Sequence, residues 1–341
     1  MSEVRQAYRL RQPIGLRIAA ALVFAAAFGG SLSEQLAQAS EAAPVVTSIM
    51  FEDHFVRLIF PPNAHKRRLM PLVLHLHGAI PTRFPNPADL ELSASGYSAL
   101  PGKYDVIVAA PTSTPHPDPE LGIYFWNATG ACCGFEHIYG PQVDDADFLL
   151  SLVDEMLTHY SVDPQRVYIY GYSNGGFMAH RMACDHADRF AAVVSGAGAT
   201  FKDPERCAPT VPISVLEVHS IADDNVLFDG GFAPEVPPSP ETEYPGAIET
   251  ITQWGHLNGC QGELRFGKRP VFDMAENTGL EGAEGKETTI NRFTRCPRGV
   301  DVELWSMDGV PHPPFFFVVG PDGIKTLARE TWQFLRRHRR Q

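Results

Sequence analysis

Residues 167–176 read Val167-Tyr168-Ile169-Tyr170-Gly171-Tyr172-Ser173-Asn174-Gly175-Gly176. The first four residues form an apolar run typical of a buried strand, and residues 177–184 continue in a helical pattern. Glycines stand two residues to either side of Ser173, where they allow strand and helix to approach without a Cβ clash. This G-x-S-x-G pattern between a strand and a helix predicts a sharp turn that presents Ser173 Oγ as a nucleophile.

Short apolar runs bounded by turn residues recur on both sides of this stretch and predict further buried strands. They are residues 55–60, 72–76, 105–110, 167–170, 191–195, 213–218 and 302–306. Helical patterns lie between them, most clearly over residues 145–160, with Asp144 at the N-cap position. This alternation predicts an α/β protein whose mostly parallel central sheet carries helices on both faces, and the serine motif specifies the α/β-hydrolase fold. We expect residues 40–341 to form one catalytic domain.

A serine hydroxyl needs a base to remove its proton, and in this fold the chain order is serine, acid, histidine. Asp223 lies in a polar turn just past the strand at 213–218, with Asp224 as its nearest rival. His312 follows the strand at 302–306 on a loop rich in glycine and proline. The later His338 lies in an arginine-rich stretch that we expect to form a C-terminal helix, where it would be a solvated surface residue. The sequence therefore predicts Ser173, Asp223 and His312 as a catalytic triad.

Two backbone N–H groups are needed to hold the oxyanion of an acyl-transfer intermediate. Asn174 follows the nucleophile and supplies one, and the loop after the strand at 72–76 supplies the other, for which Ala79 is our candidate. His75 and His77 in the same region share a strand face, but no carboxylate neighbours them, so we expect a structural role rather than a metal site. The predicted chemistry requires no cofactor.

The N-terminal 39 residues have the features of a secretory signal peptide. Arginines precede an apolar run at 18–28, and Ala37-Gln38-Ala39 forms a small-residue cleavage site. The apolar run is shorter than the roughly 20 residues that span a membrane. Cleavage removes a net charge of +2 and changes the formal charge from −12 to −14. We therefore expect a secreted protein, extracellular or periplasmic, that binds neither nucleic acid nor, after cleavage, a membrane.

An even number of cysteines in an exported chain predicts disulfide bonds. The six are Cys132, Cys133, Cys184, Cys207, Cys260 and Cys296, which sequence alone allows to pair in fifteen ways.

The chain as a whole resembles the secreted esterases grouped with polyhydroxybutyrate depolymerases and feruloyl esterases. The resemblance rests on residues 74–78, Trp126-Asn127 with Cys132-Cys133, Val143-Asp144-Asp145, 166–178, His219 through Asp223 and 226–230, 254–260, and His312. It implies that Ser173, His312 and Ala79 occupy the family's catalytic and oxyanion positions. It also favours Asp223 over Asp224, because the family's acid lies four residues after the histidine of a histidine-glycine pair. The implied disulfides are Cys260–Cys296 and Cys184–Cys207.

The sequence departs from the family pattern close to the predicted triad. Ser220 replaces the glycine after the strand-end histidine, and Leu227 replaces a proline. The glycine-rich approach to the catalytic histidine and the tryptophan after it are replaced by Val310-Pro311 and Pro313-Pro314-Phe315. These changes alter the acyl or alcohol pocket and leave the triad in place.

The residues and the resemblance together predict a serine carboxylic-ester hydrolase that works through an acyl-enzyme. The favoured substrate is a hydroxyalkanoate polyester or its oligomers, with Trp126 and its neighbours Tyr124 and Phe125 lining an apolar cleft. The alternative is a feruloyl or acetylxylan esterase acting on plant polysaccharide esters. A peptidase of the same fold uses the same triad, and an inactive hydrolase fold that serves as a binding protein is the remote alternative.

Overall fold

The computed structural model describes residues 43–64, 69–115, 122–132, 143–232, 238–275, 285–312, 320 and 323–340. The predicted signal peptide at 1–39 and Cys133 lie outside the described residues. Among the helices in these ranges, none is long and apolar enough to cross a membrane.

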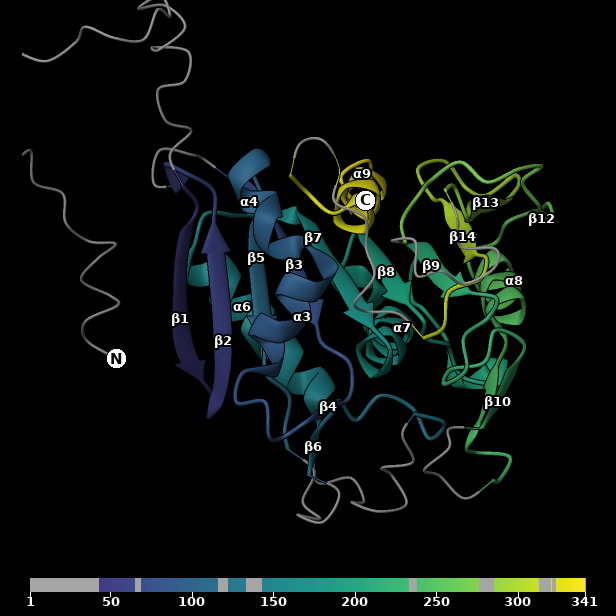
Figure 1. Cartoon of the computed structure of the whole chain (residues 1–341), viewed down its shortest axis with the longest axis horizontal. Helices are drawn as coiled ribbons and strands as arrows, with labels where there is room; N and C mark the ends of the chain where they lie inside the picture. Colours follow the sequence, from purple (N-terminus) through teal and green to yellow (C-terminus); the bar gives the residue numbers. More distant parts are fainter. Residues whose placement is uncertain are drawn as a thin grey trace, which may run out of the picture.

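A ten-stranded sheet forms the centre of the molecule (Figure 1). In spatial order its strands are β1 (Val45–Phe51), β2 (His54–Phe60), β5 (Ile107–Pro111), β3 (Met70–Leu76), β7 (Val162–Tyr172), β8 (Ala192–Gly196), β9 (Ser214–Ser220), β14 (Val302–Met307), β13 (Thr288–Phe293) and β12 (Leu264–Arg265). The six strands from β5 to β14 run parallel, and antiparallel strands extend both edges. The carboxyl ends of the parallel strands therefore meet at one edge, where ligands bind in such sheets.

Helices cover both faces of this sheet. One face carries α6 (Asp145–His159), α7 (Asn174–His186) and α8 (Ala247–Leu257), and the other carries α3 (Pro87–Ser95), α4 (Leu100–Lys103) and α9 (Thr326–Leu335). In Figure 1, α3, α4 and α9 lie in front of the sheet and α6 and α7 behind it. Short 3₁₀ turns occupy η2 (Tyr97–Ala99), η4 (Ala187–Arg189) and η5 (Pro204–Arg206). This is the α/β-hydrolase architecture that the sequence predicts.

Two short hairpins lie outside the main sheet. One pairs β4 (Ile80–Pro81) with β6 (Ile123–Tyr124), and the other pairs β10 (Gly230–Phe232) with β11 (Glu243–Pro245). Both follow strands of the parallel sheet in the chain, β4 after β3 and β10 after β9, so both lie on connections that leave the edge where the strands end.

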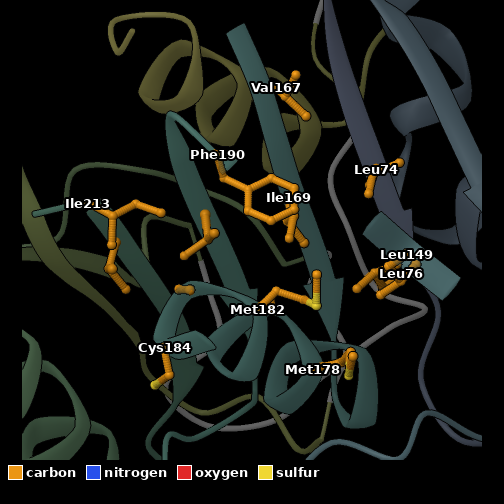
Figure 2. Close-up of a cluster of buried hydrophobic side chains, with 14 of the residues drawn as sticks. Leu74, Leu76, Leu149, Val167, Ile169, Met178, Met182, Cys184, Phe190 and Ile213 are labelled. Carbon is orange, nitrogen blue, oxygen red and sulfur yellow. The ribbon is translucent and has the colours of Figure 1, made fainter. Parts of the chain in front are cut away.

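Side chains of the central strands alternate between two hydrophobic clusters, one on each face of the sheet. In β7, Val167 and Ile169 belong to the cluster under α6 and α7, whereas Tyr168 and Tyr170 belong to the cluster under α9. Figure 2 shows Met178 and Met182 of α7 lying over the strands that carry Ile169 and Leu76. Full burial of each such side chain contributes about 1.5–3 kcal/mol. The serine motif thus stands on a strand that is packed on both sides.

The N-cap of α6 is confirmed. Asp144 Oδ1 accepts hydrogen bonds from the backbone N–H groups of Ala146 at 3.1 Å and Asp147 at 3.2 Å. These bonds satisfy two of the donors that a helix leaves unpaired at its start.

Both disulfides implied by the resemblance are present, Cys184–Cys207 and Cys260–Cys296. They join residues separated by 23 and 36 positions, and bonds of this kind stabilise a fold typically by about 2–4 kcal/mol. Cys132 is also disulfide-bonded.

The expectation that His338 is a solvated surface residue was wrong. His338 is 4% exposed and lies just beyond α9, where its Nδ1 lies 3.0 Å from Ser214 Oγ. The Tyr168 hydroxyl donates to its backbone carbonyl at 2.8 Å. Ser214 is the first residue of β9, and Tyr168 is in register with Ala192, the first residue of β8. His338 therefore lies toward the sheet edge opposite to Ser173.

Candidate active site

The turn between β7 and α7 holds Ser173 in a strained conformation. Its φ is 53° and its ψ is −121°, a region that residues with a Cβ rarely adopt. Its N–H donates to the Gly196 carbonyl at 2.7 Å. A Cβ added at Gly171 would lie 1.9 Å from the Gly175 carbonyl oxygen, and one added at Gly175 would lie 2.4 Å from that of Leu76. The two glycines are therefore required for the close crossing of backbones that supports the turn.

The three predicted triad residues meet at the carboxyl edge of the sheet. His312 Nε2 lies 3.1 Å from Ser173 Oγ, and His312 Nδ1 lies 2.7 and 2.9 Å from the two carboxylate oxygens of Asp223. Ser173 follows β7, Asp223 follows β9, and His312 follows β14, so three separate strand ends supply them. A carboxylate only accepts hydrogen bonds, so Nδ1 carries the proton and Nε2 is free to accept one from Ser173.

Asp223 and Asp224 take different positions. Asp223 is 4% exposed, and its Oδ1 also accepts the backbone N–H groups of Asn225 at 2.9 Å and Val226 at 2.8 Å. Asp224 Oδ1 instead accepts the backbone N–H of His312 at 3.2 Å. Only Asp223 therefore touches the imidazole of His312, and Asp224 holds the loop that carries it.

Ser220, one of the departures from the family pattern, links the acid loop to the histidine loop. Its hydroxyl donates to the Val310 carbonyl and accepts the Ala222 N–H, the latter at 3.2 Å. A glycine at this position would make neither bond. The substitution therefore adds a direct link between the segments that carry Asp223 and His312.

The loop after β3 passes directly beside the serine. A Cβ added at Gly78 would lie 3.2 Å from Ser173 Cβ and 3.3 Å from the Tyr172 carbonyl oxygen. This close approach places the Gly78–Ala79 peptide next to Ser173. Asn174, the residue after Ser173, begins α7. Within the described part of the chain, the N–H groups of Ala79 and Asn174 have no hydrogen-bond partner.

His77 fixes the orientation of this peptide. Its Nδ1 lies 2.6 Å from the Gly78 carbonyl oxygen, and its Nε2 accepts the Ser113 N–H at 3.0 Å. Burial lowers the pKa of His77 to about 4, so the ring is neutral and donates through Nδ1. In a trans peptide the C=O and the following N–H point in opposite directions, so holding the Gly78 carbonyl also directs the Ala79 N–H. The sequence indicated a structural role for His77 but not which peptide it holds.

Trp126, predicted to line the cleft, is fully buried and offers no surface to a substrate. Its backbone N–H donates to Asn174 Oδ1 at 2.6 Å, its carbonyl accepts from Asn174 Nδ2 at 2.9 Å, and its indole N–H donates to the His77 carbonyl at 2.9 Å. Phe125 is also buried. Trp126 therefore holds both segments that carry the candidate oxyanion donors, the start of α7 at Asn174 and the loop after β3 at His77.

The other strand histidine, His75, is likewise part of the interior. It is buried, its Nε2 lies 2.8 Å from Ser95 Oγ, and burial lowers its pKa to about 3. Over the described ranges no group of three or more His, Cys, Asp or Glu side chains is arranged to hold a metal ion.

Comparisons with known proteins relate this chain to esterases. It is 29% identical over 206 residues to feruloyl esterase B of Piromyces equi, which covers 60% of this chain and 34% of that protein. It is 33% identical over 135 residues to poly(3-hydroxyalkanoate) depolymerase C of Paucimonas lemoignei, which covers 39% of this chain and 28% of that protein. The chain thus spans about a third of the length of the curated relatives it matches. The model of the prolyl oligopeptidase family matches residues 141–203, which include Ser173.

Among solved structures, an acetyl xylan esterase from Aspergillus awamori superposes with a TM-score of 0.53 at 15% identity. The superposition covers 86% of this chain and 99% of that one, so the likeness extends over nearly the whole fold. The resemblance inferred from the motifs is therefore confirmed: the chain is related in sequence to feruloyl esterases and polyhydroxyalkanoate depolymerases, and it has the α/β-hydrolase fold.

Proposed function

We propose that the chain is a serine carboxylic-ester hydrolase with Ser173 as nucleophile, His312 as general base and Asp223 as the acid that orients it. The observation that carries the proposal is the continuous contact from Ser173 Oγ through the His312 ring to the Asp223 carboxylate, at 3.1 and 2.7 Å. The strained turn at Ser173 supports it, because such strain persists at functional sites and is otherwise avoided.

In the first half-reaction, Ser173 Oγ attacks the ester carbonyl carbon while His312 Nε2 takes the serine proton. The carbonyl oxygen becomes an oxyanion that the Ala79 and Asn174 N–H groups hold. The C–O bond to the alcohol breaks, and His312 returns the proton to the leaving oxygen. Asp223 stays ionised throughout and stabilises the imidazolium.

In the second half-reaction, water attacks the acyl-enzyme. His312 takes a proton from the water, the new tetrahedral intermediate collapses, and Ser173 leaves with the proton that His312 holds. The products are a carboxylic acid and the free enzyme. Each step uses only side chains and N–H groups of this chain together with water.

We propose a hydroxyalkanoate oligoester or polyester as the substrate. Ile221 and Leu227 flank Asp223 in the loop that carries the acid, and they are 50% and 44% exposed. Exposed aliphatic side chains in the acid loop suit an apolar acyl chain. The buried Trp126 and Phe125 provide no aromatic platform for a sugar. The relative that acts on poly(3-hydroxyalkanoate) supports this choice.

A feruloyl or acetyl ester of plant polysaccharide is the second candidate. The longest of the sequence matches described above is to a feruloyl esterase, and the matched solved structure is an acetyl xylan esterase. A Ser-His-Asp triad can cleave esters of either class. Our preference for the polyester therefore rests on the exposed aliphatic side chains of the acid loop, Ile221 and Leu227.

The two candidate substrate classes predict different relative rates of ester hydrolysis. We expect kcat/KM for a hydroxybutyrate trimer to exceed that for methyl ferulate and acetylated xylan by more than about tenfold, and Leu227→Ser to lower it by about threefold to tenfold through lost apolar contact. Val211→Ser is the matched control, since Val211 is 40% exposed and precedes β9 at the opposite edge. Faster hydrolysis of methyl ferulate would transfer the proposal to the second candidate. Cleavage of a proline-containing peptide in preference to every ester would point to a peptidase.

We also propose that the activity is exported. The Cys184–Cys207 and Cys260–Cys296 bonds persist in oxidising compartments, and the N-terminal sequence has the features of a signal peptide. Expression of the full chain in an exporting host should yield a periplasmic or extracellular protein whose N-terminus lies close to residue 40. Recovery of the protein only inside the cytoplasm, with Met1 retained, would contradict this.

A further inference from the structure

A buried group of ionisable side chains lies between β9 and α7, close to the loop that carries Asp223. Glu217 and His219 alternate along β9 and therefore point to the same face. Glu217 Oε1 lies 3.0 Å from His219 Nδ1, and Glu217 Oε2 lies 3.0 Å from Nε2 of His180 in α7. All three side chains are at most 1% exposed. The proposed mechanism uses none of them.

The hydrogen-bond partners determine which of these rings carries charge. The Trp254 indole, which can only donate, gives its hydrogen to His180 Nδ1 at 3.0 Å, so His180 is neutral and donates through Nε2 to Glu217. His219 Nε2 lies 2.8 Å from the Val226 carbonyl, which can only accept. His219 therefore donates through Nε2, and its Nδ1 faces a carboxylate.

Both carboxylate oxygens of Glu217 accept N–H donors, which is the pattern of an ionised carboxylate. An ionised Glu217 can only accept, so His219 Nδ1 must donate to it and the ring is then an imidazolium. Oε2 of Glu217 accepts from His180, and Oε1 accepts from the Gly198 N–H at 3.2 Å as well as from His219. Burial alone raises the pKa of Glu217, but the hydrogen bonds from His180 and His219 outweigh it and hold the pKa below its ordinary value. Burial likewise lowers the pKa of His219, and Glu217 reverses the shift. A buried ion pair of this kind needs every partner in place.

This cation lies next to the candidate triad acid. His219 Nε2 is 3.7 Å from Asp223 Oδ2, and the carbonyl it binds belongs to Val226, whose own N–H binds Asp223 Oδ1 at 2.8 Å. We propose that His219, held as an imidazolium by Glu217, is a positioning residue that anchors the Asp223 loop and offsets part of the charge of Asp223. The inference rests on the proposed triad.

The charges around His219 determine in which direction it shifts the pH dependence of the reaction. Glu217 contacts His219 from β9 and Asp223 approaches it from the acid loop, whereas His180 of α7 contacts Glu217. Tyr244 of β11 accepts the Leu227 N–H through its hydroxyl at 3.0 Å. Only His219 is cationic among these groups. By offsetting the negative charge of Asp223, it weakens the stabilisation of protonated His312. We therefore expect removal of the cation to move the acidic limb of the rate profile to higher pH.

The protonation state can be measured without any activity. In protein carrying ¹⁵N-labelled histidine, NMR at pH 8 should show one ring protonated at both nitrogens, with its signals absent in His219→Gln and converted to a neutral ring in Glu217→Gln. A neutral His219 ring in the wild type at pH 8 would overturn the proposal, whether or not the protein hydrolyses esters.

The functional consequence is measured as the pH dependence of kcat/KM for a short p-nitrophenyl ester. We expect Glu217→Gln and His219→Gln each to shift the midpoint of the acidic limb upward by about 0.5 to 1 pH unit. His180→Gln is the matched control, because the glutamine amide can still donate a hydrogen bond to Glu217 and so preserves the ion pair. Loss of the neutral ring should lower the melting temperature without shifting the limb. If all three variants melt at lower temperature but their acidic limbs coincide with that of the wild type, the group has only a structural role and the proposal is wrong. A wild type that hydrolyses no ester would count against the triad, and the NMR result would still decide the state of His219.

Discussion

Replacement of Ser173 by alanine should lower kcat for a short p-nitrophenyl ester by about 10⁴ to 10⁶-fold, the range found when a triad nucleophile is removed. Alanine keeps the backbone of the turn and its N–H bond to the Gly196 carbonyl, so the fold should persist. The residual rate comes from the oxyanion donors and from binding. Stopped assays at saturating ester, with circular dichroism to verify folding, measure the effect.

Ser151→Ala provides the control for this variant. Ser151 lies on α6, away from the triad, and is partly exposed. Its loss should leave kcat within about twofold of the wild type, since surface substitutions of this kind change little. A folded Ser173→Ala protein that retains more than a tenth of the wild-type kcat would mean that another residue is the nucleophile.

The second large effect separates the two neighbouring acids. Asp223→Asn should lower kcat by about 10⁴-fold, because an amide that donates to His312 Nδ1 favours the tautomer that cannot accept the Ser173 proton. Asparagine keeps an oxygen for the Asn225 and Val226 N–H groups, so the loop should survive. The expected loss is therefore mainly a loss of catalysis, measured as kcat on the same ester.

Asp224→Asn is the matched comparison, because its side-chain oxygen still accepts the His312 backbone N–H. We expect kcat to fall by less than about threefold. The reverse order, with Asp224→Asn the more damaging, would assign the acid to Asp224 and contradict the geometry of the site.

The central strands and the meeting of the three candidate triad residues could be predicted from the sequence for a physical reason. Strands buried on both faces read as continuous apolar runs, and all seven predicted strands are present. The residues that follow those runs reach one edge of a parallel sheet, so Ser173, Asp223 and His312 come together although they are far apart in the chain. The edge strand β1 was not predicted, because Val45, Val46 and Met50 are exposed and its pattern does not indicate burial.

The supporting interactions could not be predicted, since they depend on long-range contacts of side chains. Aromatic composition alone placed Trp126 in the cleft wall, whereas its three hydrogen bonds hold it behind the oxyanion loop. His338 looked solvated among arginines but packs under the start of β9. The Glu217-His219 pair carried a signal, namely two ionisable residues at alternate positions of an apolar strand. Only the structure adds His180 and shows that the pair faces the acid loop.

The measurement that tests the triad most directly is labelling of the purified protein by a fluorophosphonate, followed by mass spectrometry of its peptides. The account predicts one phosphonyl group per chain, located on Ser173, with labelling lost in Ser173→Ala and strongly slowed in Asp223→Asn. A folded wild-type protein that takes up no label, or takes it up at a residue other than Ser173, would contradict the account.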